Sequence, residues 1–237
     1  IEKTELDAQV SKLKLLKQSY LSQIYALEDS IVKYFPVEIK NTTNLISNIE
    51  KDIEIVNQNT ELDNEDKFSP MILNDKIYNK KKNAGKMLLE ICKNKETKEP
   101  EHIGEYRGMK MQLEIVGKNF ILELNNNASY IVSLGNDIHG NIIRIDNVIA
   151  DMVKKLEQNK VSLENLKQQF ENAKVDVKIP FDKEEELAEK TKRLTQLNRE
   201  LEINEKENEI IDEGIEEETK TNSKEKKSQD YNRDDFR

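Results

Sequence analysis

The sequence predicts an α+β fold in which long antiparallel coiled-coil helical arms flank a small antiparallel sheet. Apolar residues recur every seven positions toward both ends of the chain, which is typical of coiled-coil helices. Residues 103–147 instead contain segments in which apolar and polar residues alternate, the pattern of half-buried strands. Only 35% of the 237 residues are hydrophobic and 36% are charged, which suits exposed helices better than one compact globule.

The first arm is predicted over residues 1–60. Its apolar seam repeats every seven residues across 6–34, with Lys17 as the one polar interruption. Pro36 lacks a backbone donor and restricts the residue before it, so we expect it to end or kink the helix. A second seam follows directly, which gives the arm two helices that meet at Pro36. Residues 57–67 are polar and are expected to form a linker.

A tip domain is predicted over residues 67–146 as a hairpin, a helix and a meander. Residues 71–78 have the form of a hairpin closed by the two-residue turn Asn74-Asp75. A helix capped by Asn79 is expected over about residues 80–93, with an apolar stripe that could cover one face of the sheet. The meander is expected to contain strands in residues 109–115, 120–124, 130–134 and 141–145.

The second arm is predicted over residues 147–211. Its helix is expected to begin at a cap formed by Asp146 or Asn147, and its seven-residue seam has one polar break at Asn159. Pro180 interrupts this arm as Pro36 interrupts the first. The two arms are expected to pair antiparallel, and the alternative is two separate helical hairpins, each folded at its proline.

Composition and spacing argue against several functions. The single cysteine, Cys92, allows no internal disulfide, which favours a reducing, cytoplasmic compartment. No segment approaches the roughly 20 apolar residues of a membrane span. Because Cys92 and the two histidines have no metal-site spacing and no catalytic motif is present, we expect no enzyme activity, cofactor or metal. Residues 135–140 contain two glycines but are expected to join two strands, unlike a phosphate loop.

The two ends of the chain also support predictions. The chain begins with Ile1 rather than Met, so we interpret it as a piece of a larger protein. Residues 212–237 contain few large apolar side chains, which could not offset the entropy lost on ordering. A disordered acidic and polar tail is therefore predicted there.

Charge separates the predicted tip from the arms. Residues 66–147 carry 13 Lys and Arg against 11 Asp and Glu, whereas the whole chain has a formal net charge of -9. The tip could therefore contact a phosphate backbone, although its lysines could also serve only to solubilise an exposed helix. Arg144 is expected in the last strand, on the same face as Asp146 and in reach of Arg107. It could contact phosphate there, and the alternative is an ion pair of Arg144 with Asp146 or a glutamate that only holds a turn. The candidate nucleic-acid-binding residues are Lys76, Lys80, Lys81, Lys82, Lys86, Arg107, Lys110 and Arg144.

Four motifs occur in a fixed order: Ile-Gly-Glu-Tyr-Arg-Gly at 103–108, Leu-Gly-Asn-Asp-Ile-His-Gly-Asn-Ile-Ile-Arg-Ile-Asp-Asn at 134–147, Gln-Phe-Glu-Asn-Ala-Lys at 169–174, and Pro-Phe at 180–181 ahead of Glu-Glu-Glu-Leu at 184–187. Together they resemble the C-terminal region of very large proteins of bacterial conjugative elements and phages. Those proteins combine a Swi/Snf-type DEAD/DEAH-box helicase with an adenine-specific DNA methylase. The resemblance covers about residues 10–203 and implies a DNA-acting parent from a mobile element, but no catalytic residue in this chain.

Two functions are expected on this basis. The first is a non-catalytic, DNA-contacting accessory region, in which a helical stalk carries a small domain to the duplex and the remaining helicase and methylase domains are partners. Restriction–modification specificity subunits offer a fold-level analogy. The second is a coiled-coil interaction or assembly module without direct DNA contact, whose seams could also form an oligomer. The tip charge favours the first function, and the net charge of -9 favours the second.

Overall fold

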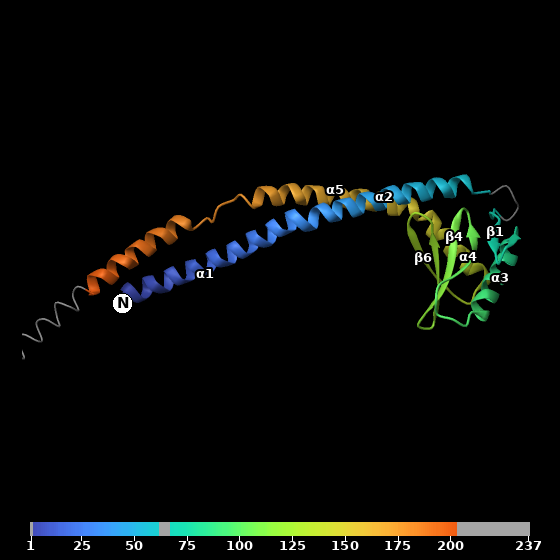
Figure 1. Ribbon diagram of the computed structural model, residues 1–237, viewed down its shortest axis with the longest axis horizontal. Helices are drawn as coiled ribbons and strands as arrows, with labels where there is room; N and C mark the ends of the chain where they lie inside the picture. The colour runs from blue at the N-terminus through green and yellow to red at the C-terminus, as the bar shows by residue number, and fades with distance from the viewer. Residues whose placement is uncertain (1, 62–66, 203–237) are drawn as a thin grey trace, which may run out of the picture. The chain divides into compact units, whose positions relative to one another are not determined.

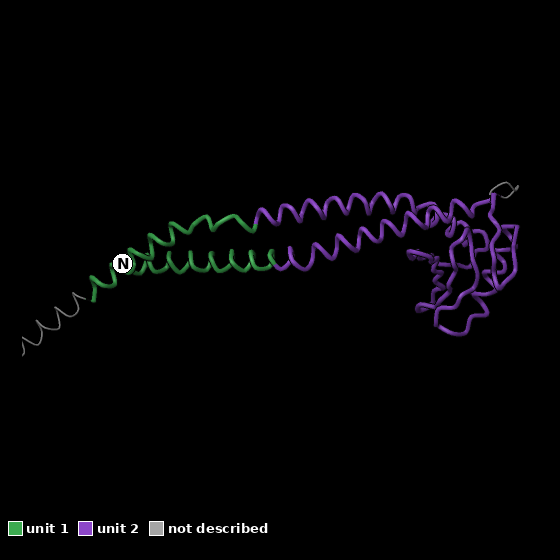
Figure 2. The backbone as a smooth tube through the Cα atoms, turned by 45° about the horizontal axis from the view of Figure 1, so that its top comes forward, with its two compact units in different colours: residues 1–28, 177–237 green, residues 29–176 purple. Residues whose placement is uncertain are grey.

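The computed structural model describes residues 2–61 and 67–202, and the fold is α+β. The chain divides into two compact units, residues 1–28 with 177–237 and residues 29–176 (Figure 2). Part of the predicted linker, the end of the second arm beyond residue 202 and the predicted tail at 212–237 lie outside the described residues.

In the part of the chain that the structure describes, six strands form one antiparallel sheet in the order β2-β1-β3-β4-β5-β6 (Figure 1). The strands are β1 (Met71–Leu73), β2 (Lys76–Tyr78), β3 (Glu101–Tyr106), β4 (Met109–Val116), β5 (Asn119–Asn125) and β6 (Ser129–Leu134). Asn74 and Asp75 close the first hairpin with φ angles of 46° and 63°, as a two-residue turn with positive φ at both positions requires. Alternation in β4 buries Met109, Met111 and Leu113 on one face of the sheet.

Strand β3 was not predicted, because apolar and polar residues do not alternate clearly in its sequence Glu-His-Ile-Gly-Glu-Tyr. Its pairing with β4 shifts register between His102 and Gly104. Gly104 also lets β1 approach, since a Cβ atom there would lie 1.8 Å from the carbonyl oxygen of Ile72. The pairing of β1 with β3 therefore depends on glycine at this position.

The prediction of a strand at residues 141–145 was wrong. These residues belong to helix α4 (Ile138–Ala150), whose buried side chains Asn141, Ile142, Ile145 and Ile149 follow the spacing of a helix. Asp137 caps α4, because its side chain accepts a hydrogen bond from the Gly140 N–H at 2.6 Å. The predicted cap at Asp146 or Asn147, and the predicted domain boundary between them, consequently fall inside a helix.

Helices α3 (Lys81–Asn94) and α4 cover the buried face of the sheet (Figure 1). Ala84 and Leu88 of α3 share one core with Ile142 and Ile145 of α4. The helices approach closely at Gly85, where a Cβ atom would lie 2.4 Å from the carbonyl oxygen of Ile138. The predicted cap at Asn79 was wrong, because Lys80 occupies the N-cap position without a side-chain cap hydrogen bond.

Helix α2 (Phe35–Gln58) packs against helix α5 (Met152–Asp176). The side chains of Ile49 and Leu156 share one cluster, and the rings of Phe35 and Phe170 lie 5.5 Å apart. The order of these contacts along the chain means that the two helices run antiparallel. Pro36 does not break the helical course: a π-helical turn (Ser30–Tyr34) precedes α2, and the proline falls in the first turn, where no backbone donor is needed.

The other unit contains α1 (Glu2–Asp29) up to residue 28 and a helix over residues 184–202. Val10 and Leu13 pack against Leu187. Lys17, the polar position of the predicted seam, pairs with the carboxylate of Glu184 at 2.6 Å. None of the helices in residues 2–61 and 67–202 is both long and apolar enough to span a membrane.

Candidate functional site

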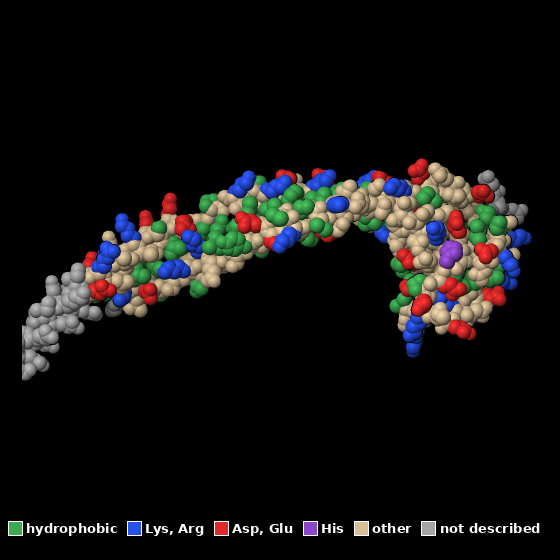
Figure 3. Space-filling model, viewed as in Figure 1, with side chains coloured by type: hydrophobic (Ala, Val, Ile, Leu, Met, Phe, Trp, Pro, Cys, Tyr) green, Lys and Arg blue, Asp and Glu red, His purple; other side chains and the backbone are tan. Residues whose placement is uncertain are grey.

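Exposed lysines gather on one side of the sheet domain, on β2 and α3. Figure 3 shows Lys and Arg side chains along the edge where Figure 1 places α3 and the β1–β2 hairpin. Lys82 and Lys86 are one helical turn apart, and Lys93 extends the same side of α3. We call the following residues the α3 lysine patch: Lys76, Lys80, Lys82, Lys86 and Lys93. Within the described residues, none of the five has a carboxylate within 4.0 Å.

Two of the candidate nucleic-acid-binding cations, Lys81 and Arg107, contact the carboxylate of Asp146. Its carboxylate lies 3.1 Å from the guanidinium of Arg107 and 3.7 Å from the ammonium of Lys81. The Tyr106 hydroxyl also donates to this carboxylate at 2.8 Å. Burial, followed by the nearby charge of Asp146, raises the pKa of Tyr106 well above its ordinary value, so the hydroxyl remains a donor. Lys81 and Arg107 thus share the single negative charge of Asp146, and the three groups together keep one positive charge.

The backbone at Arg107 is fixed in an uncommon conformation. Its φ angle is 49°, and its guanidinium lies 5.1 Å from the centre of the Tyr106 ring. Only 14% of the Arg107 side chain is exposed. The arginine therefore packs over the Tyr106 ring at the β3–β4 turn and is mostly buried.

Lys110 and Arg144 lie apart from the α3 lysine patch. Lys110 stands between the buried residues Met109 and Met111 of β4, so it projects from the opposite face of the sheet to α3. Arg144 lies on α4 and donates to the side-chain oxygen of Asn141 at 2.9 Å. The prediction that Arg144 shares a face with Asp146 was wrong, because residues two apart in a helix lie about 200° apart around its axis.

Residues 135–140 do not join two strands as predicted: residues 135–137 follow β6, and residues 138–140 are the first residues of α4. Asp137 occupies the helix N-terminus with its own carboxylate. The buried side chain of Asn141 accepts from the Gly135 N–H at 2.7 Å and donates to the Gly135 carbonyl oxygen at 2.8 Å. Asp137 therefore caps one N–H of the helix, and Asn141 fixes the backbone of Gly135 ahead of it. Within residues 2–61 and 67–202, no three His, Cys, Asp or Glu side chains are grouped to hold a metal ion.

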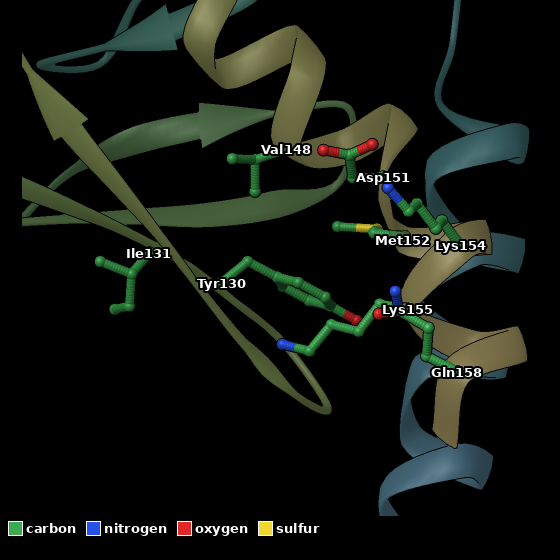
Figure 4. Close-up of a pocket in the computed structure, with 8 residues that line it drawn as sticks. All are labelled: Tyr130, Ile131, Val148, Asp151, Met152, Lys154, Lys155 and Gln158. Atoms are coloured by element: carbon green, nitrogen blue, oxygen red, sulfur yellow. The ribbon is translucent and has the colours of Figure 1, made fainter. Parts of the chain in front are cut away.

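A pocket beside β6 was not predicted. Its volume is about 370 Å³. It lies between the edge strand and the junction of α4 with α5 (Figure 4). The ammonium of Lys155 lies 5.0 Å from the centre of the Tyr130 ring. The lining residues are Tyr130, Ile131, Val148, Asp151, Met152, Lys154, Lys155 and Gln158. The sequence shows the pair Lys154-Lys155, but only the strand order places it at a sheet edge.

Asp52 of α2 anchors the turn between β5 and β6. One carboxylate oxygen accepts from the N–H and the side-chain amide of Asn127, both at 2.9 Å. The other accepts from the Ala128 N–H at 2.8 Å and the Tyr130 hydroxyl at 3.0 Å. Burial and the charge of Asp52 raise the pKa of Tyr130 above its ordinary value, so its hydroxyl also stays a donor. The sequence could have indicated that Asp52 is buried, since it lies on the same side of the helix as Ile49 and Val56.

Comparisons with known proteins do not assign this site. No protein-family model, no curated protein and no solved structure matches the chain. The resemblance to helicase–methylase proteins therefore stays a prediction.

Proposed function

We propose that this chain is a non-catalytic accessory region of a DNA-acting helicase and methylase, and that it contacts duplex DNA through the α3 lysine patch. The observation that carries the proposal is the absence of a carboxylate partner for any lysine of the patch among the described residues. Unpaired ammonium groups bind phosphates as point charges, without reading base sequence. The contact would therefore position the parent protein on DNA without selecting a site.

The proposal includes an arrangement for presenting this patch. Long antiparallel coiled-coil arms flank a tip built as hairpin, helix and meander, in a cytoplasmic protein whose remaining helicase and methylase domains carry out the chemistry. The packing of Ile49 and Phe35 of α2 against Leu156 and Phe170 of α5 supports this arrangement, together with the seven-residue repeats.

A salt titration tests the DNA contact. Fluorescence anisotropy of a labelled duplex is measured with the full chain at increasing salt, for wild type and for the double variant Lys82→Glu and Lys86→Glu. Each lost phosphate contact should reduce the slope of log affinity against log salt by about 1. The matched control is Lys12→Glu with Lys14→Glu on α1, both exposed. Absence of binding by wild type at low salt, or equal affinity in the patch variant, would contradict the proposal.

A second function is favoured by one observation on α5. Val153, Val161 and Val175 are 57%, 61% and 63% exposed. They lie within a sector of about 80° around the helix axis. An apolar stripe of this kind suits pairing with another helix, and therefore a coiled-coil interaction or assembly module without DNA contact.

Sedimentation equilibrium separates the two functions. If the second is correct, the wild type should associate as its concentration rises, and Val161→Lys with Val175→Lys should remain monomeric. An association that these substitutions leave unchanged would exclude this stripe as the assembly surface. Monomeric wild type with salt-dependent DNA binding supports the first function alone.

A further inference from the structure

The two edge strands of the sheet differ in their protection against pairing. β2 has three residues and carries Lys76, whereas β6 has six residues and neither a charged side chain nor a proline. Natural sheets protect free edges with short strands, charges and prolines. Among the described residues, no strand pairs with the outer side of β6. Its backbone is therefore available to another extended segment.

The pocket lies directly beside this edge. Figure 4 shows Tyr130 and Ile131 projecting from β6 in different directions, with Val148 and Met152 on the helices across from them. The volume of about 370 Å³ gives room for the side chains of a strand laid along β6. When a peptide adds a strand to a sheet edge, hydrogen bonds of its main chain supply affinity, and pockets for its side chains supply specificity.

The charge of the pocket beside β6 indicates which kind of ligand it would bind. Lys154 and Lys155 line it, and neither has a carboxylate within 4.0 Å among the described residues, although Asp151 also lines the pocket. The Tyr130 ring holds the ammonium of Lys155 at the strand edge. A second copy of β6 would not neutralise these lysines, because its sequence Ser-Tyr-Ile-Val-Ser-Leu contains no carboxylate.

We propose that an extended acidic peptide segment of a partner protein binds along β6 and adds a strand to the sheet. Its carboxylates lie beside Lys154 and Lys155, and an apolar side chain contacts Val148 and Met152. This surface is separate from the α3 lysine patch: β6 and β2 are opposite edges of the sheet, and α3 packs beside β1 and β2 whereas α4 packs beside β6. The inference does not depend on DNA binding.

The probe is a fluorescein-labelled peptide in which valine and glutamate alternate, titrated with the full chain and followed by anisotropy. One matched peptide replaces glutamate by lysine. Two others carry N-methyl groups on one or the other alternate set of backbone amides. Because only one side of an added strand faces β6, one methylated peptide should lose binding and the other should keep it. The lysine peptide should not bind.

Protein variants locate the binding. Lys154→Glu with Lys155→Glu should weaken binding of the acidic peptide by roughly tenfold or more, the combined contribution of two surface ion pairs. Lys82→Glu with Lys86→Glu, on the opposite edge, should leave it unchanged. Hydrogen exchange at the β6 amides should slow when the peptide binds.

Four results would overturn the proposal. These are no binding of the acidic peptide at millimolar concentration, equal binding of both methylated peptides, exchange protection that leaves out β6, and displacement of the peptide by duplex DNA. The last result would assign the groove to nucleic acid. If only the DNA proposal is wrong, the wild-type chain will bind the acidic peptide but will not bind duplex DNA.

Discussion

Asp52 joins helix α2 to the β5–β6 turn through both of its carboxylate oxygens. The group is fully buried, and its acceptor capacity is used by backbone and side-chain donors of three residues. Asp146 has a similar position on α4, where it collects Tyr106, Arg107 and Lys81. In both places one carboxylate fixes side chains that are distant in the sequence.

Replacing Asp52 by Ala should destabilise the sheet domain. The change leaves several donors without an acceptor in a buried site, so we expect the free energy of unfolding to fall by roughly 2–4 kcal/mol. Urea denaturation measures the change. The matched control is Lys51→Ala, the exposed neighbour on α2, which should change stability by less than about 0.5 kcal/mol. Equal stability of the two variants would show that the Asp52 hydrogen bonds contribute little.

Cys92 gives a prediction about pH. Burial raises the pKa of its thiol from 9.0 to about 11. The folded state then holds its proton more tightly than the unfolded state, so this contribution to stability is present below pH 9 and is lost as the pH rises through 11. The free energy of unfolding should fall more steeply over this interval for wild type than for Cys92→Ala. Parallel profiles would contradict the assignment.

At the scale of elements, α2 and α5 are held together by apolar contacts on one side of each helix. Leu156 is buried in this contact, whereas Val161 on the same helix faces solvent. The same charged substitution at these two positions therefore distinguishes the cost of burying a charge from the cost of adding one to the surface of α5.

Leu156→Asp should lower the melting temperature and helicity substantially. It places a charge between α2 and α5, at an expected cost of roughly 3 kcal/mol or more. Val161→Asp adds the same charge on the exposed side and should leave the melting curve almost unchanged. Circular dichroism during heating measures both. A Leu156→Asp protein as stable as Val161→Asp would mean that α2 and α5 do not depend on this contact.

The strands β4, β5 and β6 could be predicted because alternation is a local property of the sequence. Residues 141–145 could not be assigned in the same way, since a short run containing Ile142, Ile143 and Ile145 fits either a strand or a helix. The Asp137 cap and the further buried positions Asn141 and Ile149 decide in favour of the helix. Gly104 hid β3, because a glycine interrupts the pattern that identifies a strand.

The candidate site was harder to predict than the strands. Nothing local in the sequence shows that Asp146 forms an ion pair with Arg107, which lies 39 positions earlier in the chain. The position of Lys110 could have been inferred, since its neighbours Met109 and Met111 are both apolar and must share the buried face. The pocket beside β6 could not be predicted, because it requires that β6 be an edge strand, and alternation alone does not give the order of strands in a sheet.

At the scale of the whole molecule, the two units have separate apolar cores. Val10, Leu13 and Leu187 form one cluster in residues 1–28 and 177–237. The sheet, α3 and α4 contribute a larger cluster within residues 29–176. A unit with its own core is expected to fold without the rest of the chain.

A fragment comprising residues 29–176 should therefore fold alone. We expect its far-ultraviolet circular dichroism to show helix and sheet, and its hydrogen-exchange protection at β4 and β5 to equal that of the full chain. The same fragment carrying Leu156→Asp serves as a control for loss of fold. An unfolded or aggregated wild-type fragment would show that residues 1–28 or 177–237 are required.

The hydrogen bonds at Asp52 also have a mechanical consequence. A tensile load on α2 reaches the β5–β6 turn partly through the packing of Ala128 against Ile46 and Ile49. The rest passes through one carboxylate, which accepts from the N–H groups of Asn127 and Ala128, the Asn127 amide and the Tyr130 hydroxyl. Bonds that converge on one point share the force and break together, whereas bonds along a ladder open one after another. The polar part of this attachment is therefore expected to resist a load on α2 until its four hydrogen bonds break together.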